Sequence, residues 1–113
     1  MARGGFPGMG GPNMQQLMRQ AQKMQDQMVK LQEELDARTY EAAAGGGMVR
    51  VKVSGKRELL ELTIDPQAVD PEDVEMLQDL VLAAVNEALR LGEDTRESEM
   101  GKIQGAAGLG GMF

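Results

Sequence analysis

The feature that most constrains this chain is a regular stripe of apolar residues between positions 14 and 35. Apolar side chains recur there at alternating spacings of three and four residues, which on an α-helix places them at the a and d positions of a heptad repeat. A helix of about 24 residues is ~36 Å long, which exceeds the width of a domain of this size. So narrow a stripe packs against a partner helix, either the second helix of the same chain or a second copy. The predicted seam consists of Met14, Leu17, Ala21, Met24, Met28, Leu31 and Leu35.

Two alternating segments further along the chain predict a β-hairpin. Residues 48–53 alternate apolar and basic side chains, with Arg50 and Lys52 on the polar side, and this is the pattern of a strand with one solvated face. A turn at residues 54–56 leads into a second alternating segment at residues 58–64. We expect the apolar faces of the two strands to meet on the core side. The residues concerned are Val49, Val51 and Val53 on the first strand and Leu60, Leu62 and Ile64 on the second.

The segment before this hairpin is ambiguous by pattern alone. Residues 39–44 begin with Thr and Tyr, which favour a strand, and continue with alanines that either extend a strand or fray. Three glycines at residues 45–47 interrupt the chain before the next strand. No Gly-Lys-Ser sequence or helix follows them, so they indicate a connector and not a phosphate-binding loop.

A second long helix is predicted to follow the hairpin. Asp70 is expected to cap it and Pro71 to occupy its first position. Gly92 predicts a kink or an early end, after which residues 93–102 form a charged, exposed helical extension. The apolar stripe is wider than a seam, as expected for a helix that covers a sheet and touches a neighbour. Its residues are Val74, Leu77, Leu80, Val81, Ala84, Val85, Ala88, Leu89 and Leu91.

These segments predict an α+β fold in the order helix, two or three antiparallel strands, helix. Glycine is concentrated near the two ends, so we expect one domain at residues 13–102 between flexible tails at residues 1–12 and 103–113. Both helices outrun strands of five to seven residues, which span only ~17–23 Å, and should project beyond the sheet as arms. A two-fold dimer would cover the apolar stripes and the exposed sheet edge together.

Charge is distributed unevenly along the chain. The net charge is −6, but residues 1–32 contain four basic residues against Asp26, and the remainder contains 8 basic and 17 acidic residues. A basic arm on an acidic body can bind phosphate groups locally, although solvated helix surface explains the same residues before other observations are added. The candidates for DNA contact are Arg19, Lys23 and Lys30, on the side of the first helix that faces away from the stripe, and Arg50 and Lys52 on the solvated strand face.

The sequence offers little for catalysis or for a bound cofactor. It contains no His and no Cys, which removes the commonest general base, the thiol nucleophile and the usual metal ligands. Aromatic residues number only three, which disfavours base stacking on a sheet. No apolar run is long enough to cross a membrane. We therefore expect no enzyme, no metal or cofactor, no small-molecule substrate and no membrane partner.

Four segments in order resemble the YbaB/EbfC family of nucleoid-associated proteins. Its first helix is similar to QAQKMQDQM at residues 20–28, followed by LQEEL at residues 31–35. The Gly-rich entry to its second strand resembles GGGMVRV at residues 45–51, and its third strand and exit resemble LTIDP at residues 62–66. Its last helix resembles DVEMLQDL at residues 73–80 with AAVNEA at residues 83–88. Each motif is weak alone, and together they are specific over about residues 13–100.

The resemblance implies a cytoplasmic, nucleoid-associated homodimer with an α-β-β-β-α protomer and a tweezer-like two-fold shape. It makes residues 38–44 the first strand of a small three-stranded antiparallel sheet. It implies double-stranded DNA as the partner, with altered DNA conformation, nucleoid organisation and gene regulation as the roles. No catalytic residue is carried over. The alternative is a protein–protein adaptor that uses the Met-rich helix or the Gly-rich tails.

Overall fold

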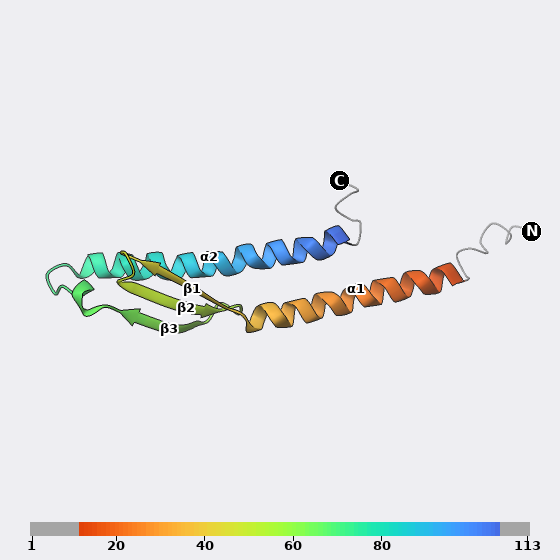
Figure 1. The fold of residues 1–113 in the computed structure, drawn as a ribbon, viewed down its shortest axis with the longest axis horizontal. Helices are drawn as coiled ribbons and strands as arrows, with labels where there is room; N and C mark the ends of the chain where they lie inside the picture. Colours follow the sequence, from red (N-terminus) through yellow and green to blue (C-terminus); the bar gives the residue numbers. More distant parts are fainter. Residues whose placement is uncertain (1–11, 107–113) are drawn as a thin grey trace, which may run out of the picture.

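The computed structural model describes residues 12–106 and has the predicted α-β-β-β-α order (Figure 1). The first helix is α1 (Pro12–Ala37), and three strands follow as β1 (Thr39–Ala44), β2 (Val49–Ser54) and β3 (Leu59–Ile64). A short 3₁₀ turn, η2 (Pro66–Ala68), precedes the last helix, α2 (Val74–Ala106). The α+β fold and the hairpin are confirmed, and the ambiguous segment at residues 39–44 is a strand.

The strands form one antiparallel sheet in the order β1-β2-β3. Val51 pairs with Leu62, but a register shift between Lys52 and Val53 places Leu59, and not Leu60, opposite Val53. Leu60 and Leu62 also remain about half exposed, since α2 packs mainly on β1 and β2. The expectation that both leucines join the core of the protomer is therefore wrong.

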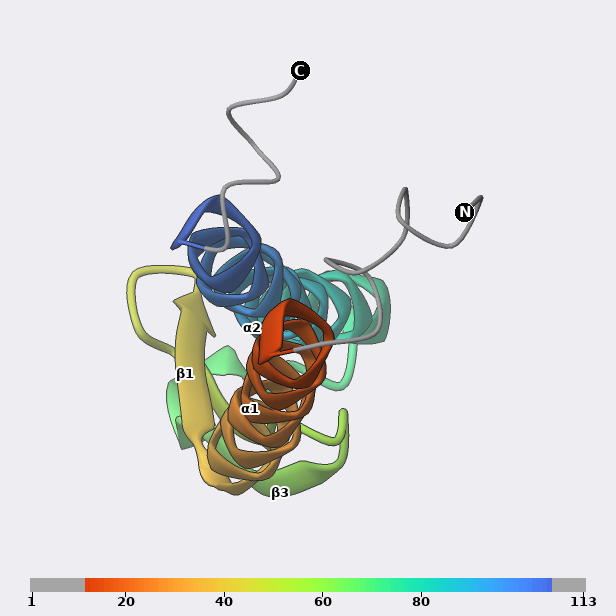
Figure 2. The same ribbon diagram turned by 90° about the vertical axis from the view of Figure 1, so that its right-hand side faces the viewer.

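The core lies between β2 and α2. Val49, Val51 and Val53 on the inner face of β2 are buried, as are Ala84 and Ala88 on α2. Alanine at the two helix positions lets the α2 backbone approach the sheet closely, and the larger valines fill the space that remains. Seen along the long axis (Figure 2), α2 lies on one face of the sheet.

The start of α2 differs from the predicted start. Asp70 accepts a hydrogen bond from the amide of Glu72 in a turn, and α2 begins only at Val74. The carboxylate of Asp73 accepts a hydrogen bond from the amide of Met76, at 3.2 Å, which is the bond that an N-cap residue makes. Asp73 therefore takes the capping role that was predicted for Asp70.

Gly92 does not end α2, which continues without interruption to Ala106. A Cβ atom on Gly92 would lie 3.2 Å from Cδ2 of Tyr40, so the glycine makes room for an aromatic ring from β1. The helix extends four residues into the predicted C-terminal tail. Helix α1 likewise begins at Pro12, the last residue of the predicted N-terminal tail. Residues 1–11 and 107–113 of the predicted tails lie outside the described part of the chain.

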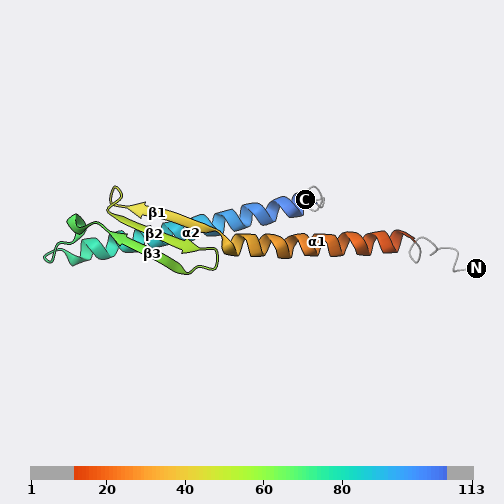
Figure 3. The same cartoon turned by 60° about the horizontal axis from the view of Figure 1, so that its bottom comes forward.

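The two helices project past the sheet in the same direction and run antiparallel to each other (Figures 1 and 3). The molecule measures 87 × 25 × 17 Å, and the N-terminal part of α1 extends beyond the end of α2. In the predicted seam, Leu35 is fully buried and Met24, Met28 and Leu31 are partly buried, whereas Met14, Leu17 and Ala21 are exposed. The C-terminal part of the stripe is therefore covered within the protomer, and its N-terminal part is not.

Candidate nucleic-acid interface

Three exposed basic residues lie on α1, the arm that projects beyond the sheet. Arg19 and Lys23 are one turn apart and Lys30 is two turns further on, so helical geometry places them along one side. Within residues 12–106, none of the three has an acidic partner within ion-pair distance. Asp26 interrupts this side, three residues after Lys23 and four before Lys30. These three cations are therefore not neutralised by ion pairs, although α1 also carries Asp26 between them and Glu33, Glu34 and Asp36 in its last turns.

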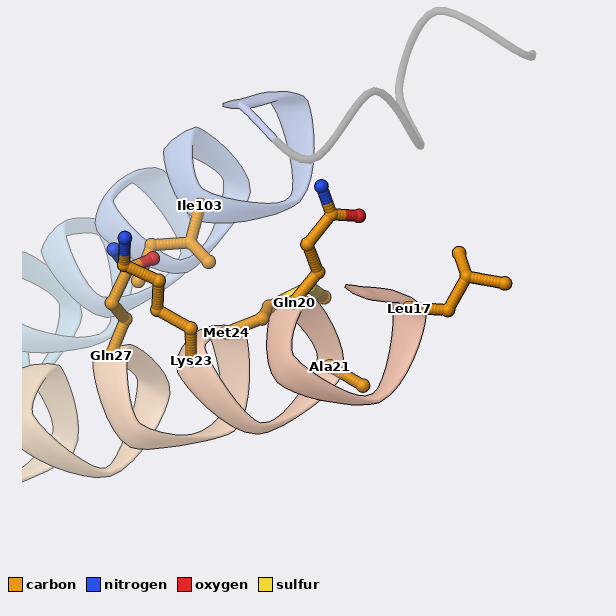
Figure 4. A pocket seen from close by; sticks show the side chains of 7 residues that line it. All are labelled: Leu17, Gln20, Ala21, Lys23, Met24, Gln27 and Ile103. Atoms are coloured by element: carbon orange, nitrogen blue, oxygen red, sulfur yellow. The ribbon is translucent and has the colours of Figure 1, made fainter. Parts of the chain in front are cut away.

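The arm and α2 border an open groove of about 540 Å³. Figure 4 shows Lys23 and Gln27 directed toward α2, whereas Leu17 and Ala21 point away from it. Lys23 was expected to face away from the apolar stripe, and it instead flanks the stripe and lines the groove beside Met24. Its ammonium group is therefore presented between the two projecting helices.

Lys52 has a carboxylate partner that the sequence pattern did not reveal. Its Nζ lies 2.8 Å from Oε2 of Glu61 on β3, and Glu41 stands opposite it on β1. The hydrogen bond to Glu61 and the charges of both carboxylates raise the pKa of Lys52 above its ordinary value. This cation is compensated in the free protein, so it has less charge available for a phosphate than the residues of the arm.

Arg50 is exposed and lies away from the arm. It follows the β1–β2 turn at the end of the sheet opposite the projecting part of α1 (Figure 1). Its Nε donates to the carbonyl oxygen of Gly47 at 3.3 Å, and no carboxylate of the described chain lies within ion-pair distance. A single protomer therefore does not bring Arg50 together with the three basic residues of α1.

One further basic residue without an acidic partner in residues 12–106 is Lys56, in the β2–β3 hairpin near the base of α1. Sequence reasoning recognised the turn there and did not select the lysine. Basic residues elsewhere are held in ion pairs on the body of the protein. These residues are Arg38, Lys52, Arg57, Arg90, Arg96 and Lys102. Pairing therefore concentrates the available positive charge on α1 and at the two turns.

Two apolar surfaces remain uncovered on the described chain. One joins β3 to α2: an open, apolar hollow of about 480 Å³ is lined by Ile64, Leu77, Val81 and Leu82, and Leu82 is 60% exposed. The other is the N-terminal part of the apolar stripe on α1, where Leu17 is also 60% exposed. A contiguous apolar patch on a protein surface commonly marks an interaction site, whereas scattered single apolar residues do not.

Residues 12–106 contain neither a metal-binding cluster nor a membrane-crossing helix. The acidic side chains there do not gather in any group of three that would hold a metal ion. Neither helix combines the length and the apolar character that crossing a lipid bilayer requires.

The sequence matches the model of the YbaB/EbfC DNA-binding family over residues 9–107. Curated relatives named nucleoid-associated protein include one from Alkaliphilus metalliredigens and one from Clostridium novyi, each 56% identical over 114 residues. Another, from Ruminiclostridium cellulolyticum, is 57% identical over 115 residues, and all three alignments cover 100% of both chains. Among solved structures, an uncharacterized protein from Helicobacter pylori is similar with a TM-score of 0.66 and 28% identity. That similarity covers 79% of this chain and 94% of the other.

Proposed function

The chain belongs to the YbaB/EbfC DNA-binding family, a family of nucleoid-associated proteins, and from this premise we propose that it binds double-stranded DNA as a homodimer, mainly through the DNA backbone. The observation that carries the proposal is the row of uncompensated basic side chains on the projecting arm, Arg19, Lys23 and Lys30. Phosphate contacts from such side chains give affinity without reading the base sequence. Arg50 and Lys52 contribute less, because one lies at the opposite end of the sheet and the other is ion-paired.

Dimerisation is supported by the uncovered apolar surface on β3 and α2. A second copy placed on Ile64, Val81 and Leu82 would remove apolar area from water and would protect β3, whose outer edge pairs with no strand in the described chain. The exposed N-terminal part of the α1 stripe, at Met14, Leu17 and Ala21, can pack against this second copy or against a further one. A two-fold arrangement also doubles the number of basic arms, so that DNA is gripped at two places.

The dimer is tested by light scattering on variants of matched chemistry. Leu82→Glu places a charge in the proposed contact and should give a monomer at micromolar concentration. Val29→Glu changes a residue that is also exposed and apolar, 48% exposed on α1, but lies outside that contact, and should leave the dimer intact. A wild-type monomer at the same concentration would contradict the homodimer.

DNA binding is tested by gel shift across a range of salt. The three arm residues give six basic side chains in a dimer, and six phosphate contacts predict a loss of roughly 10³ in affinity between about 50 and 200 mM salt. Reversing Arg19 and Lys23 to Glu should weaken binding to every sequence. Reversing Arg57 and Arg90, which are ion-paired on the body, changes the net charge equally and should weaken binding far less. No shift of the wild type at low salt would refute DNA binding.

The proposal extends to DNA conformation and to location. Backbone contacts from two separated arms stabilise whichever DNA shape fits both arms, so bending or stiffening should accompany binding. Ligase-catalysed circularisation of short DNA fragments measures this change. We expect the protein to colocalise with the nucleoid in the cytoplasm and to affect transcription of genes to which it binds, which chromatin immunoprecipitation with transcript profiling tests.

A protein–protein adaptor is the alternative, and the exposed Met14, Leu17 and Met18 on the arm favour it. Methionine is flexible and polarisable and adapts to varied partner surfaces. A partner that remains bound after nuclease treatment would support the adaptor. Recovery of partner proteins only when the DNA is intact would support the proposed DNA-binding function over the adaptor.

A further inference from the structure

The arm α1 is connected to the sheet by one residue. Helix α1 ends at Ala37 and β1 begins at Thr39, so only Arg38 lies between them. A single connecting residue does not by itself fix the direction of a 26-residue helix, because small changes in its φ and ψ angles move the far end by many ångströms. Contacts made by other elements must hold the arm in place.

The β2–β3 hairpin supplies the first of these contacts. The amide of Gly55 donates a hydrogen bond to the carbonyl oxygen of Arg38 at 2.9 Å. A Cβ atom on Gly55 would lie only 1.8 Å from the carbonyl oxygen of Leu35. The hairpin backbone is thus packed directly against the last turn of α1, and only glycine permits that approach.

Helix α2 supplies the second contact through Arg96. Its Nη2 donates to Oδ1 of Asp36 in the last turn of α1 at 2.7 Å and to the carbonyl oxygen of Gly55 at 3.2 Å. One guanidinium group therefore joins α1, the hairpin and α2. Its side chain is 32% exposed, and the space beside it, bordered by Gly55 and Gly92, has a volume of only about 10 Å³.

Electrostatics make this contact specific to Arg96. The last turn of α1 contains no basic residue of its own, and Asp36 places a carboxylate there, near the negative end of the helix dipole. Arg96 provides the missing cation. The neighbouring pair, Arg38 with Glu99, is longer at 3.9 Å and its arginine is more exposed than Arg96, so it does not replace the hydrogen bond between Arg96 and Asp36.

From this geometry we propose that Arg96 is a positioning residue for DNA binding: it holds the arm in one orientation relative to the sheet without itself contacting DNA. The inference rests on the proposed DNA-binding function. It predicts that loss of Arg96 leaves every basic residue of the arm in place but lets the arm pivot about Arg38. Binding at two places then weakens, because fewer protein conformations present both arms correctly.

The matched pair of variants is Arg96→Gln and Arg90→Gln. Both residues lie on α2 and both changes remove one positive charge, but the partners of Arg90 within residues 12–106 are Glu87 and Asp94 on its own helix. Arm orientation is measured by pulsed electron spin resonance between nitroxides on cysteines introduced at Gln22 and Thr63. The chain has no native cysteine, and dilution with unlabelled protein isolates the distance within one protomer.

We expect Arg96→Gln to broaden the distance distribution roughly twofold and to weaken DNA binding roughly tenfold relative to Arg90→Gln. The slope of log affinity against log salt should stay the same, since no phosphate contact is lost. Asp36→Asn removes the same ion pair and leaves Gly55 in place, so it should shift both measurements in the same direction. It also serves if Arg96→Gln does not fold, as judged by circular dichroism.

Three results would overturn the inference. They are equal effects of the two arginine variants, a broadened distribution with unchanged relative affinity, or a salt slope reduced by about two with a narrow distribution. The last result indicates one direct phosphate contact from Arg96 of each protomer. Failure of the wild type to bind DNA would refute the proposed function and the DNA role of Arg96 together. The distance measurement on DNA-free protein distinguishes that failure from an error in the proposed role of Arg96, because it reports directly whether Arg96 holds α1 in one orientation.

Discussion

Substitution of alanine for two glycines of α2 should have different effects on the free energy of unfolding. Gly92 and Gly101 both lie inside the helix, where glycine is less favourable than alanine by about 0.8–1.0 kcal/mol. Their surroundings differ. A Cβ atom at Gly92 would meet the Tyr40 ring at 3.2 and 3.3 Å, whereas one at Gly101 would meet nothing within 4 Å.

The expected magnitudes follow from these distances. At Gly101 the gain in helix propensity is unopposed, so Gly101→Ala should raise the free energy of unfolding by up to about 1 kcal/mol. At Gly92 the ring of Tyr40 must move by a few tenths of an ångström, and overpacking costs typically about 1–3 kcal/mol. Gly92→Ala should therefore range from neutral to a loss of about 2 kcal/mol.

Urea unfolding followed by circular dichroism at 222 nm, at one fixed protein concentration, measures both variants. The fixed concentration matters because a dimer unfolds at a concentration-dependent midpoint. If Gly92→Ala proves as stabilising as Gly101→Ala, Tyr40 does not constrain this position. Gly92→Ala in a Tyr40→Ala background should recover the gain in helix propensity, which isolates the contact from other effects.

Three further predictions concern stability. Asp73→Ala should lower the free energy of unfolding by about 0.5–2 kcal/mol because the hydrogen bond from the Met76 amide is lost. Asp73→Ser should retain most of the stability that this cap contributes. Equal losses in the two variants would argue against capping. Leu35→Ala should cost about 2–5 kcal/mol, since Leu35 is fully buried; a loss below 1 kcal/mol, on the order of a surface change, would contradict that burial. Because Glu61 raises the pKa of Lys52 above its ordinary value, the contribution of this pair should be constant from neutral pH to about pH 10.5 and decrease as pH rises through the raised value. Comparing wild type with Lys52→Gln across that range measures it, and a stability difference that grows with alkaline pH would exclude this account.

The sequence by itself determined the elements and their order. Spacings of three and four residues predicted α1, and alternation of apolar with polar residues predicted β2 and β3, because both patterns follow from geometry within a single element. The alanines of β1 have no such pattern, so the residues left a strand or a frayed end open there and the family resemblance decided for a strand. Arg19, Lys23 and Lys30 could be selected as exposed cations, since helical spacing shows which residues share a side.

Only the tertiary structure decided which groups meet across elements. The register shift beside Val53 exchanged Leu59 for Leu60, and strand pairing brought Glu61 to Lys52. Gly92 reads locally as a weak point in a helix, but it is the position at which Tyr40 packs. The contact of Arg96 with Asp36 joins residues 60 positions apart. Periodicity describes one element at a time, whereas pairing and close approach depend on how separate elements pack, and that information is spread over the whole chain.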